Sequence, residues 1–450
     1  MPRRALSLAL GLLTLLAAYT PRSAFANGRF PRAQQITSVP GDGQRLFLRA
    51  TFGVLFSKDG GASWRWVCEQ ALGFTGAWDP PIAATKDGTL YVGLMDGLRS
   101  TVDGCSYADA TELHGEMVTD LASDAAGLWA ATSTPQKPAF LWRKRGAEPF
   151  RRIGKGLTGF YLDTLDASPS RPSRLYVTGV ETGKPVSAHL FRSDDAGVTL
   201  TELHPKLPTE GRLFLAAIDP KDDKRILVRL LGREGSDLLL STDAGESFVT
   251  ALHMKGSMFG FARTRDGVTV WAGSGDAEDG LYRSTDRGAT FTPVAKTTIF
   301  CLHRSADKLL TCSNPFTQGG YAIGASTDDG VTVLPIAQFA DIAGPVSCDG
   351  GAGEKCQGSD WQVMHAPLTT PTSTPAATPA SMGDAATAPG DAAPTPAVTR
   401  SARCGCAVIG RPAEFPRLPL SLPVLALIWR RWQRRRMDRS SSMPTVHMRR

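Results

Sequence analysis

The chain has 450 residues, of which 50 are Lys or Arg and 43 are Asp or Glu, so its formal net charge is +7. The positive charge lies at the two ends: residues 1–26 hold three arginines and no acid, and residues 400–450 hold twelve arginines against Glu414 and Asp438. The stretch 27–399 has 35 basic and 41 acidic residues and is net acidic. Because phosphate binding needs a clustered basic face, we expect no nucleic-acid partner.

The first 26 residues have the pattern of a secretory signal peptide. Arg3 and Arg4 precede the apolar stretch "ALSLALGLLTLLAAY", and "AFA" ends at Ala26 as a small-residue cleavage site. The apolar stretch is shorter than the roughly 20 residues that a membrane-spanning helix requires. We therefore expect an exported protein whose mature chain begins near residue 27.

A short phrase then recurs along the chain. It reads "SKDGGASW" at 57, "STVDGCSY" at 100, "SDDAGVTL" at 193, "STDAGESF" at 241, "STDRGATF" at 284 and "STDDGVTV" at 326, with a degenerate copy, "RKRGAEPF", at 143. Successive copies start 43, 43, 50, 48, 43 and 42 residues apart. Each is preceded by β-rich segments such as "TLYVGLMDGLRS". About four short strands per unit of this length indicate a β-propeller, and seven units predict seven blades.

The phrase resembles the Asp box, or BNR repeat, of sialidases, sortilin-type receptors, some xyloglucan-cleaving glycosidases and the photosystem assembly propellers. The resemblance covers residues 33–340 and implies that each turn joins the third and fourth strands of a blade, away from the ligand-binding channel. Ser, Asp and Gly suit a tight turn, since the first two hydrogen-bond to the backbone and Gly adopts positive φ. Their recurrence makes them structural rather than catalytic, and their spacing does not match a calcium loop. The predicted structural residues are Ser57, Asp59, Gly61, Trp64, Ser193, Asp195, Gly197, Ser241, Asp243, Gly245, Phe248, Ser284, Asp286, Gly288, Phe291, Ser326, Asp328 and Gly330.

The loops that enter each blade, and those between its second and third strands, differ from unit to unit. An asymmetric site requires such variation, although neutral drift also produces it. An aromatic ring beside carboxylates suits a sugar or a peptide. The candidate ligand-binding residues in these loops are Trp78, Asp79, Asp96, Glu116, Tyr161, Glu181, Arg233 and Asp276.

Three functions follow from this arrangement. We expect a non-catalytic binding module for an extracellular glycan or protein; the alternatives are an Asp-box glycosidase and a structural scaffold. The glycosidase hypothesis predicts two carboxylates with shifted pKa values that converge in the channel over an aromatic floor. The segment "RFPRAQQI" at 29–36 has the letters of the early sialidase motif in the wrong order, so no catalytic role is assigned. No motif predicts a cofactor or a metal site.

Six of the eight cysteines lie in the predicted propeller and its extension, which suits an oxidising compartment. Cys301 and Cys312 flank a predicted hairpin and are expected to pair across it. Cys348 and Cys356 would close a Gly-rich loop, which leaves Cys68 with Cys105 by elimination. This pairing is one hypothesis among the 15 connectivities that six cysteines allow.

The C-terminal region changes character abruptly. Residues 367–403 are rich in Pro, Ala and Thr and predict an extended linker. Cys404 and Cys406, the apolar run "LPLSLPVLALIW" and the cluster "RRWQRRR" then resemble the MYXO-CTERM sorting signal of myxobacterial surface proteins, which implies processing near a lipidated cysteine. A plain membrane anchor is the alternative, and either places the protein at the outer surface.

The sequence thus predicts an all-β, seven-bladed propeller. Its expected boundaries are a signal peptide at 1–26, the propeller at 27–345, a disulfide-closed extension at 346–366, the linker at 367–403, the sorting or anchor segment at 404–436 and a polar tail at 437–450. An eighth blade formed by residues 341–365 would change the blade count.

Overall fold

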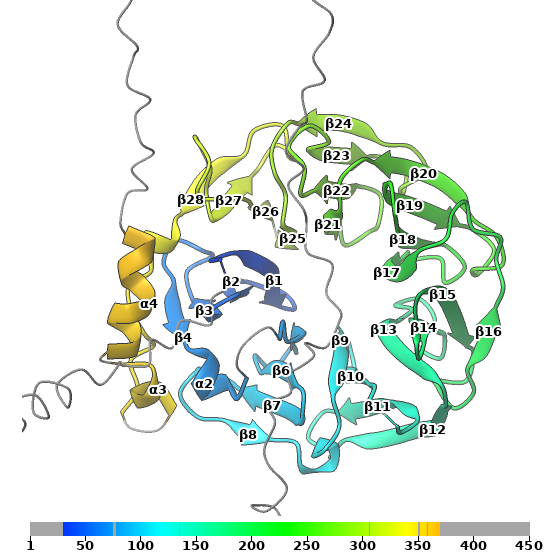
Figure 1. Cartoon of the computed structure of the whole chain (residues 1–450), viewed down its shortest axis with the longest axis horizontal. Helices are drawn as coiled ribbons and strands as arrows, with labels where there is room; N and C mark the ends of the chain where they lie inside the picture. Colours follow the sequence, from blue (N-terminus) through cyan, green and yellow to red (C-terminus); the bar gives the residue numbers. More distant parts are fainter. Residues whose placement is uncertain are drawn as a thin grey trace, which may run out of the picture. The chain divides into compact units, whose positions relative to one another are not determined.

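The computed structural model describes residues 30–369, except 75–77, 135, 306, 350–351 and 358. The predicted signal peptide, nearly all of the predicted linker and the sorting cysteines Cys404 and Cys406 lie outside these residues. Within the described part, 28 strands form seven four-stranded antiparallel sheets. Figure 1 shows the sheets as blades around a central axis, so the predicted seven-bladed β-propeller is confirmed.

Each blade consists of four strands that are consecutive in sequence, with the first strand innermost (Figure 1). Blades 1 and 2 contain β1 (Ala33–Val39), β2 (Asp42–Ala50), β3 (Gly53–Ser57) and β4 (Arg65–Val67), then β5 (Ile82–Ala84), β6 (Leu90–Leu94), β7 (Gly97–Thr101) and β8 (Ala108–Asp109). Blades 3 and 4 contain β9 (Val118–Asp124), β10 (Gly127–Thr132), β11 (Ala139–Arg145) and β12 (Arg151–Leu157), then β13 (Phe160–Ala167), β14 (Leu175–Glu181), β15 (Lys184–Ser193) and β16 (Thr201–Leu203).

The remaining three blades follow the same plan. They contain β17 (Arg212–Ile218), β18 (Ile226–Gly232), β19 (Gly235–Ser241) and β20 (Val249–Met254), then β21 (Met258–Arg263), β22 (Val270–Ser274), β23 (Leu281–Ser284) and β24 (Thr292–Ala295), and finally β25 (Cys301–Ser305), β26 (Lys308–Cys312), β27 (Ile323–Ser326) and β28 (Leu334–Ala337). Short helical segments are α2 (Glu69–Leu72), η1 (Thr111–Leu113), η2 (Phe339–Asp341), α3 (Ala352–Lys355) and α4 (Ser359–Thr369).

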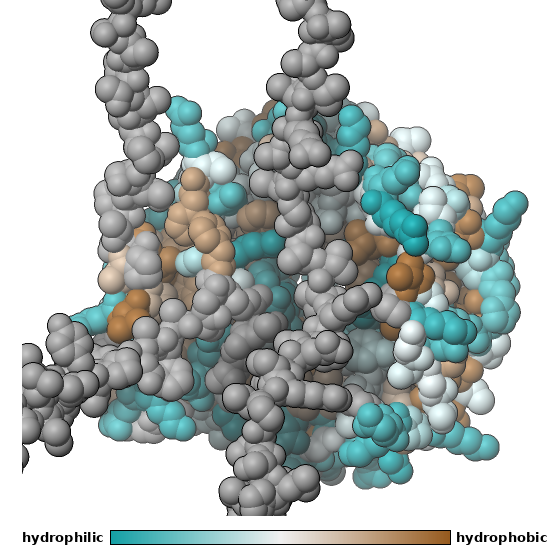
Figure 2. Space-filling view, in the orientation of Figure 1, coloured by the Kyte–Doolittle hydropathy of each residue, from teal (hydrophilic) through white to brown (hydrophobic). Residues whose placement is uncertain are grey.

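The middle strands of the blades are covered on both faces by neighbouring blades. β3, β6 and β22, with the sequences "GVLFS", "LYVGL" and "VWAGS", are buried along their whole length. A short, continuous apolar run is the pattern expected of a strand covered on both faces. The face shown in Figure 2 accordingly has hydrophilic side chains along the rim, with smaller hydrophobic patches between them. No helix in the described part of the chain is long and apolar enough to cross a membrane.

Five turns between third and fourth strands share one hydrogen-bonded geometry, and we call them the Ser-Asp-Gly turns. In the turn after β19, the Ser241 hydroxyl donates to Asp243 at 2.7 Å and accepts from the Gly245 N–H at 2.9 Å. The Asp243 carboxylate also accepts the N–H and the hydroxyl of Ser247. The same bonds recur in the turns that begin at Ser57, Ser193, Ser284 and Ser326.

The aspartates of these turns are held in their ionised form. Partial burial opposes ionisation of Asp286, but hydrogen bonds from Ser284 and Thr290 outweigh it and lower its pKa to about 2. The pKa values of Asp59, Asp195, Asp243 and Asp328 are lowered by the corresponding bonds. Each of these carboxylates is thus occupied by its own turn. The residue after the turn can pack beneath it, as Trp64 does with 2 % exposure and an indole N–H donated to the Gly61 carbonyl.

The ring closes without exchange of a strand between the first and last blades. β1 lies against β25, and the His303 Nε2 atom is 2.8 Å from the Ser38 hydroxyl oxygen. Burial lowers the pKa of His303 to about 4, so its imidazole is neutral at pH 7. One apolar cluster joins blade 1 to blade 7 across this junction, including Leu46, Leu310 and Phe339.

Beyond β28 the chain crosses from blade 7 to blade 1 and pairs with the rim strand of that blade. Trp66 donates its N–H to the Gly344 carbonyl at 2.9 Å and accepts the Val346 N–H at 2.9 Å, forming a parallel bridge with Pro345. Residues beyond 346 continue into α3 and α4, which lie beside β4 and α2 in Figure 1. No eighth blade is present among the described residues, because this segment is an edge strand followed by helices.

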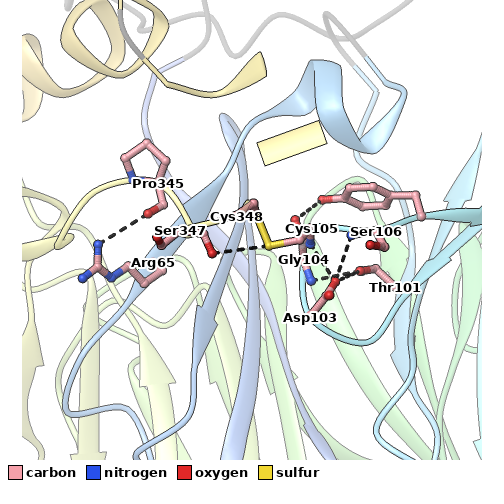
Figure 3. The surroundings of a disulfide bond; sticks show 10 residues. Arg65, Thr101, Asp103, Gly104, Cys105, Ser106, Pro345, Ser347 and Cys348 are labelled. Atoms are coloured by element: carbon pink, nitrogen blue, oxygen red, sulfur yellow. Dashed lines mark hydrogen bonds between the residues drawn. A yellow bond between two sulfur atoms is a disulfide. The ribbon is translucent and has the colours of Figure 1, made fainter. Parts of the chain in front are cut away.

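Two of the three predicted disulfides are wrong. Cys301 and Cys312 are register partners in β25 and β26 and are bonded as expected. The other disulfides join Cys68 to Cys356 and Cys105 to Cys348, the latter beside Arg65 and Pro345 in Figure 3. Cys348 and Cys356 do not close their own loop because the extension runs along the rims of blades 1 and 2, where each meets a different partner.

We expect the two disulfides of the extension to stabilise the propeller more than the Cys301–Cys312 disulfide. They join cysteines 288 and 243 residues apart, whereas the hairpin disulfide spans 11 residues, and restriction of the unfolded chain grows with loop length. Replacing Cys68 and Cys356 by Ser should cost about 3 kcal/mol more than replacing Cys301 and Cys312. Urea unfolding of both variants measures the difference. Equal losses of unfolding free energy would contradict the expectation that the extension holds blades 1 and 2 together.

Candidate functional site

The eight predicted ligand-binding residues lie on one face of the propeller, opposite the Ser-Asp-Gly turns. This follows from strand direction, because antiparallel pairing brings the start of the first and third strands and the end of the second and fourth strands to the same side. Trp78, Asp79 and Glu116 lie in loops that enter a blade, and Tyr161 begins β13. Asp96, Arg233 and Asp276 lie between second and third strands, and Glu181 is the last residue of the second strand β14.

The structure brings two of these eight residues together. Trp78 and Asp96 line a groove of about 750 Å³ on the loop face of blade 2. The groove also contains residues that the sequence did not single out. Those with apolar side chains are Phe74, Leu94, Met95 and Leu98, and those with polar side chains are Arg99, Asp109, Thr111 and His114.

The groove combines an apolar lining with charged groups at its edge. Trp78 is half-buried and donates its indole N–H to the Gly93 carbonyl at 3.3 Å, while Met95 is 62 % exposed. His114 Nε2 lies 4.0 Å from Asp96 Oδ2, and both side chains are exposed. An apolar surface with a few directed polar groups is the usual composition of a ligand-binding site.

Arg99 fixes one wall of the groove. Its guanidinium donates to both oxygens of Asp109, at 2.7 and 3.1 Å, and to the Ala71 carbonyl at the end of α2 at 3.2 Å. The hydrogen bond from Arg99 lowers the pKa of Asp109. Because Cys68 immediately precedes α2 and is bonded to Cys356, the same helix is also tied to the C-terminal extension. The groove wall is therefore anchored from two sides.

The other six predicted residues do not join this groove. Asp79 accepts from the Gln34 amide at 2.8 Å, and Glu116 accepts from the Thr134 hydroxyl at 3.2 Å. Glu181 pairs with Lys184 at 2.8 Å. Burial raises the pKa of Tyr161 to about 12, with the Arg212 guanidinium 5.8 Å from its ring. Asp276 accepts the Glu278 N–H within its own loop, and Arg233 is exposed on blade 5.

A second polar site lies on the inner strands, and sequence reasoning missed it. Asp120 on β9 and Asp166 on β13 line a cavity of about 240 Å³ between β9, β13 and β17. Burial, with smaller contributions from the charges of Asp166 and Asp163, raises the pKa of Asp120 to about 7 against the hydrogen bond from the Leu165 N–H. Burial also raises the pKa of Asp166 to about 6, although Arg263 opposes the shift.

The walls of this cavity are aliphatic or hydroxylic. They are formed by Leu121, Ala122, Ser123, Thr164, Leu165, Leu215 and Ala216. The cavity thus has the two carboxylates with shifted pKa values that the glycosidase hypothesis predicts, but it has no aromatic floor. The available signal was an Asp inside the strand segment "VTDLASD", where one residue in two faces the same side of the blade. No group of three or more His, Cys, Asp or Glu side chains in the described residues is arranged to hold a metal ion.

The raised pKa of Asp120 predicts a pH-dependent stability. A carboxylate whose folded-state pKa is raised from 3.8 to about 7 favours folding below its unfolded pKa, and that advantage is lost as pH rises toward 7. Asp120→Asn removes the charge and keeps an acceptor for the Leu165 N–H. We expect the variant to gain stability over the wild type at pH 8 but not at pH 3.5, as measured by urea unfolding. Matching pH profiles would show that Asp120 is not held protonated.

Comparison with known proteins adds little beyond the fold. No family model matches the sequence, and no curated protein matches it. Among solved structures it is similar to a GH74 xyloglucanase from Xanthomonas campestris, with 16 % identity, a TM-score of 0.33 and coverage of 67 % of this chain and 57 % of that one. It is also similar to YCF48 from Cyanidioschyzon merolae, with 12 % identity, a TM-score of 0.46 and coverage of 62 % and 92 %. The chain therefore spans little more than half of the xyloglucanase.

Proposed function

We propose that this protein is an exported, surface-tethered propeller that binds a glycan or a protein segment, without catalysis, in the groove on blade 2. The groove itself is the observation that carries the proposal. Trp78 and Met95 offer apolar contact area, and Asp96, His114 and Thr111 offer hydrogen-bonding groups to one ligand. The hydrogen bond from Arg99 lowers the pKa of Asp109, a carboxylate that lines this groove, whereas a general acid requires a raised one.

Export and tethering are supported by the sequence signals at both ends and by the three disulfides, which persist in oxidising compartments. We also propose that the Ser-Asp-Gly turns are Asp boxes of the sialidase and sortilin-like superfamily. The repeated Ser, Asp and Gly geometry supports this assignment. On this reading the turns hold the blades in shape, and recognition is left to the opposite face.

Binding should depend on the groove and not on other exposed groups of the same face. We expect Trp78→Ala and Met95→Ala each to weaken ligand binding about tenfold, since buried aromatic and apolar contacts contribute most to recognition. The measurement is a glycan array screen of the purified, oxidised protein, followed by titration of any ligand found. Phe316→Ala is the matched control, because Phe316 is an exposed aromatic residue in a loop of blade 7.

Met95 is largely exposed, so its replacement separates lost contact from lost folding. If Phe316→Ala weakens binding as much as Met95→Ala, the ligand lies elsewhere on the loop face. If the array finds no glycan, a protein ligand remains as the other half of the proposal. Crosslinking to a protein partner through position 95 would support it, whereas absence of both kinds of ligand would favour a purely structural role.

A glycosidase is the second candidate, and the channel carboxylates are the observation that favours it. Burial raises the pKa of Asp120 to about 7 and that of Asp166 to about 6, so the two carboxylates together keep a proton closer to neutral pH than exposed ones do, as a general acid requires. The proposed binding function predicts no turnover of chromogenic glycosides or polysaccharides. Turnover would make this protein a glycosidase if Asp120→Asn and Asp166→Asn each reduce it by 100-fold or more. Trp78→Ala is checked for folding and assayed in parallel.

A further inference from the structure

Blade 3 differs from the other blades at its turn. The copy of the repeated phrase between β11 and β12 has Arg145 at the position of the turn aspartate, which is Asp59, Asp195 or Asp243 in blades 1, 4 and 5. The turn is a tighter one, in which the Glu148 N–H donates to the Arg145 carbonyl at 2.9 Å. A position that carries a bound negative charge elsewhere thus carries an exposed positive charge here.

The rim strand that follows continues the positive charge. β12 has the sequence "RRIGKGL", and its Arg151, Arg152 and Lys155 are exposed. Gly154 and Gly156 adopt positive φ, and β12 bulges between Ile153 and Leu157. Together with Arg145, the three cations of β12 form a row of four, which we call the blade 3 basic edge. The ion pairs of the described chain include none of the four.

Edge protection alone does not account for this charge. Lysine and arginine on a rim strand discourage pairing with another chain. However, the rim strand β20 is six residues long and contains neither, and β8, β16, β24 and β28 also lack them. The remaining rim strand has one, Arg65, whose guanidinium donates to carbonyls of the extension. Only in blade 3 do several free cations occupy the rim of the described structure.

Two acidic residues beside the basic edge, Glu148 and Asp195, offset part of its positive charge. Glu148 is the acid in the turn, and its carbonyl accepts from Lys144. Asp195 belongs to the neighbouring turn of blade 4, which packs against Gly154, and its carboxylate is occupied by Ser193 and Thr199. Arg152 is supported from below by the Phe140 ring at 4.4 Å. The edge is therefore a positive strip on a body that is net acidic.

We propose that the blade 3 basic edge binds an acidic polysaccharide, a linear chain with repeated carboxylate or sulfate groups. The cations are spread from the turn along the rim strand, so they can contact successive charges along a linear polymer. A lipid surface would be expected to engage exposed apolar anchors, and the apolar residues of β12, Ile153 and Leu157, are partly buried. A rigid DNA duplex would approach the acidic remainder of the body. This surface is separate from the blade 2 groove and does not depend on the function proposed for it.

The test compares two matched triple variants of the oxidised protein, with alginate as the acidic polysaccharide and dextran as the neutral one. Arg145→Gln, Arg151→Gln and Lys155→Gln remove three charges of the edge and leave Arg152 on its ring. Lys206→Gln, Lys255→Gln and Arg265→Gln remove three exposed charges from other blades. We expect alginate binding that weakens with salt, falls about tenfold in the edge variant and changes less than about twofold in the control.

Equal loss in both variants, or no alginate binding by the wild type, would overturn the proposal. If the edge variant keeps its alginate affinity but self-associates in light scattering, the cations protect the strand edge instead. DNA and phosphatidylglycerol vesicles are tested in parallel, and edge-dependent binding to either without binding to alginate would show that the assigned occupant is wrong.

Discussion

The whole fold depends on closing the ring between blade 1 and blade 7. A blade can bury both faces of its inner strands only against two neighbours, so an open ring would expose β1 and β25. Because every blade is built from consecutive strands, no strand from one terminus completes the blade of the other. The junction instead relies on apolar packing, the His303–Ser38 contact and the extension that pairs with β4. Two disulfides then fix that extension to blades 1 and 2.

Closure and the candidate groove share structural parts. Cys68 links the extension to the start of α2, and the end of α2 accepts a hydrogen bond from Arg99, which also holds Asp109. A chain of contacts thus runs from the extension to the groove wall beside Trp78. Preorganised walls reduce the entropy lost when a ligand binds. The extension therefore helps to fix the wall of the blade 2 groove.

The repeated phrase carried enough information to predict the blades, because its spacing equals one four-stranded unit and its Ser, Asp and Gly residues make the same local bonds each time. Local chemistry also predicted the Cys301–Cys312 pair, whose partners are register neighbours. The other disulfides depend on where the extension crosses the ring, which no local pattern specifies. The same is true of the groove: Trp78 and Asp96 were identified singly, whereas Met95 and His114 gain their meaning only from being placed beside them. Asp120 and Asp166 were missed because strand residues give no local sign of facing a shared cavity.

The two faces of the propeller divide structural and chemical roles. On one face, five turns commit their aspartates to backbone and hydroxyl donors of the same turn, which hold those carboxylates in their ionised form. On the other face the loops differ, and there the groove lies. Blade 3 departs from this division at one turn, where Arg145 stands in place of the aspartate and the strand that follows is cationic. A blade can lose the hydrogen-bonding residues of its turn because it also packs against both neighbouring blades. The positions of those residues can then carry side chains that interact with a partner.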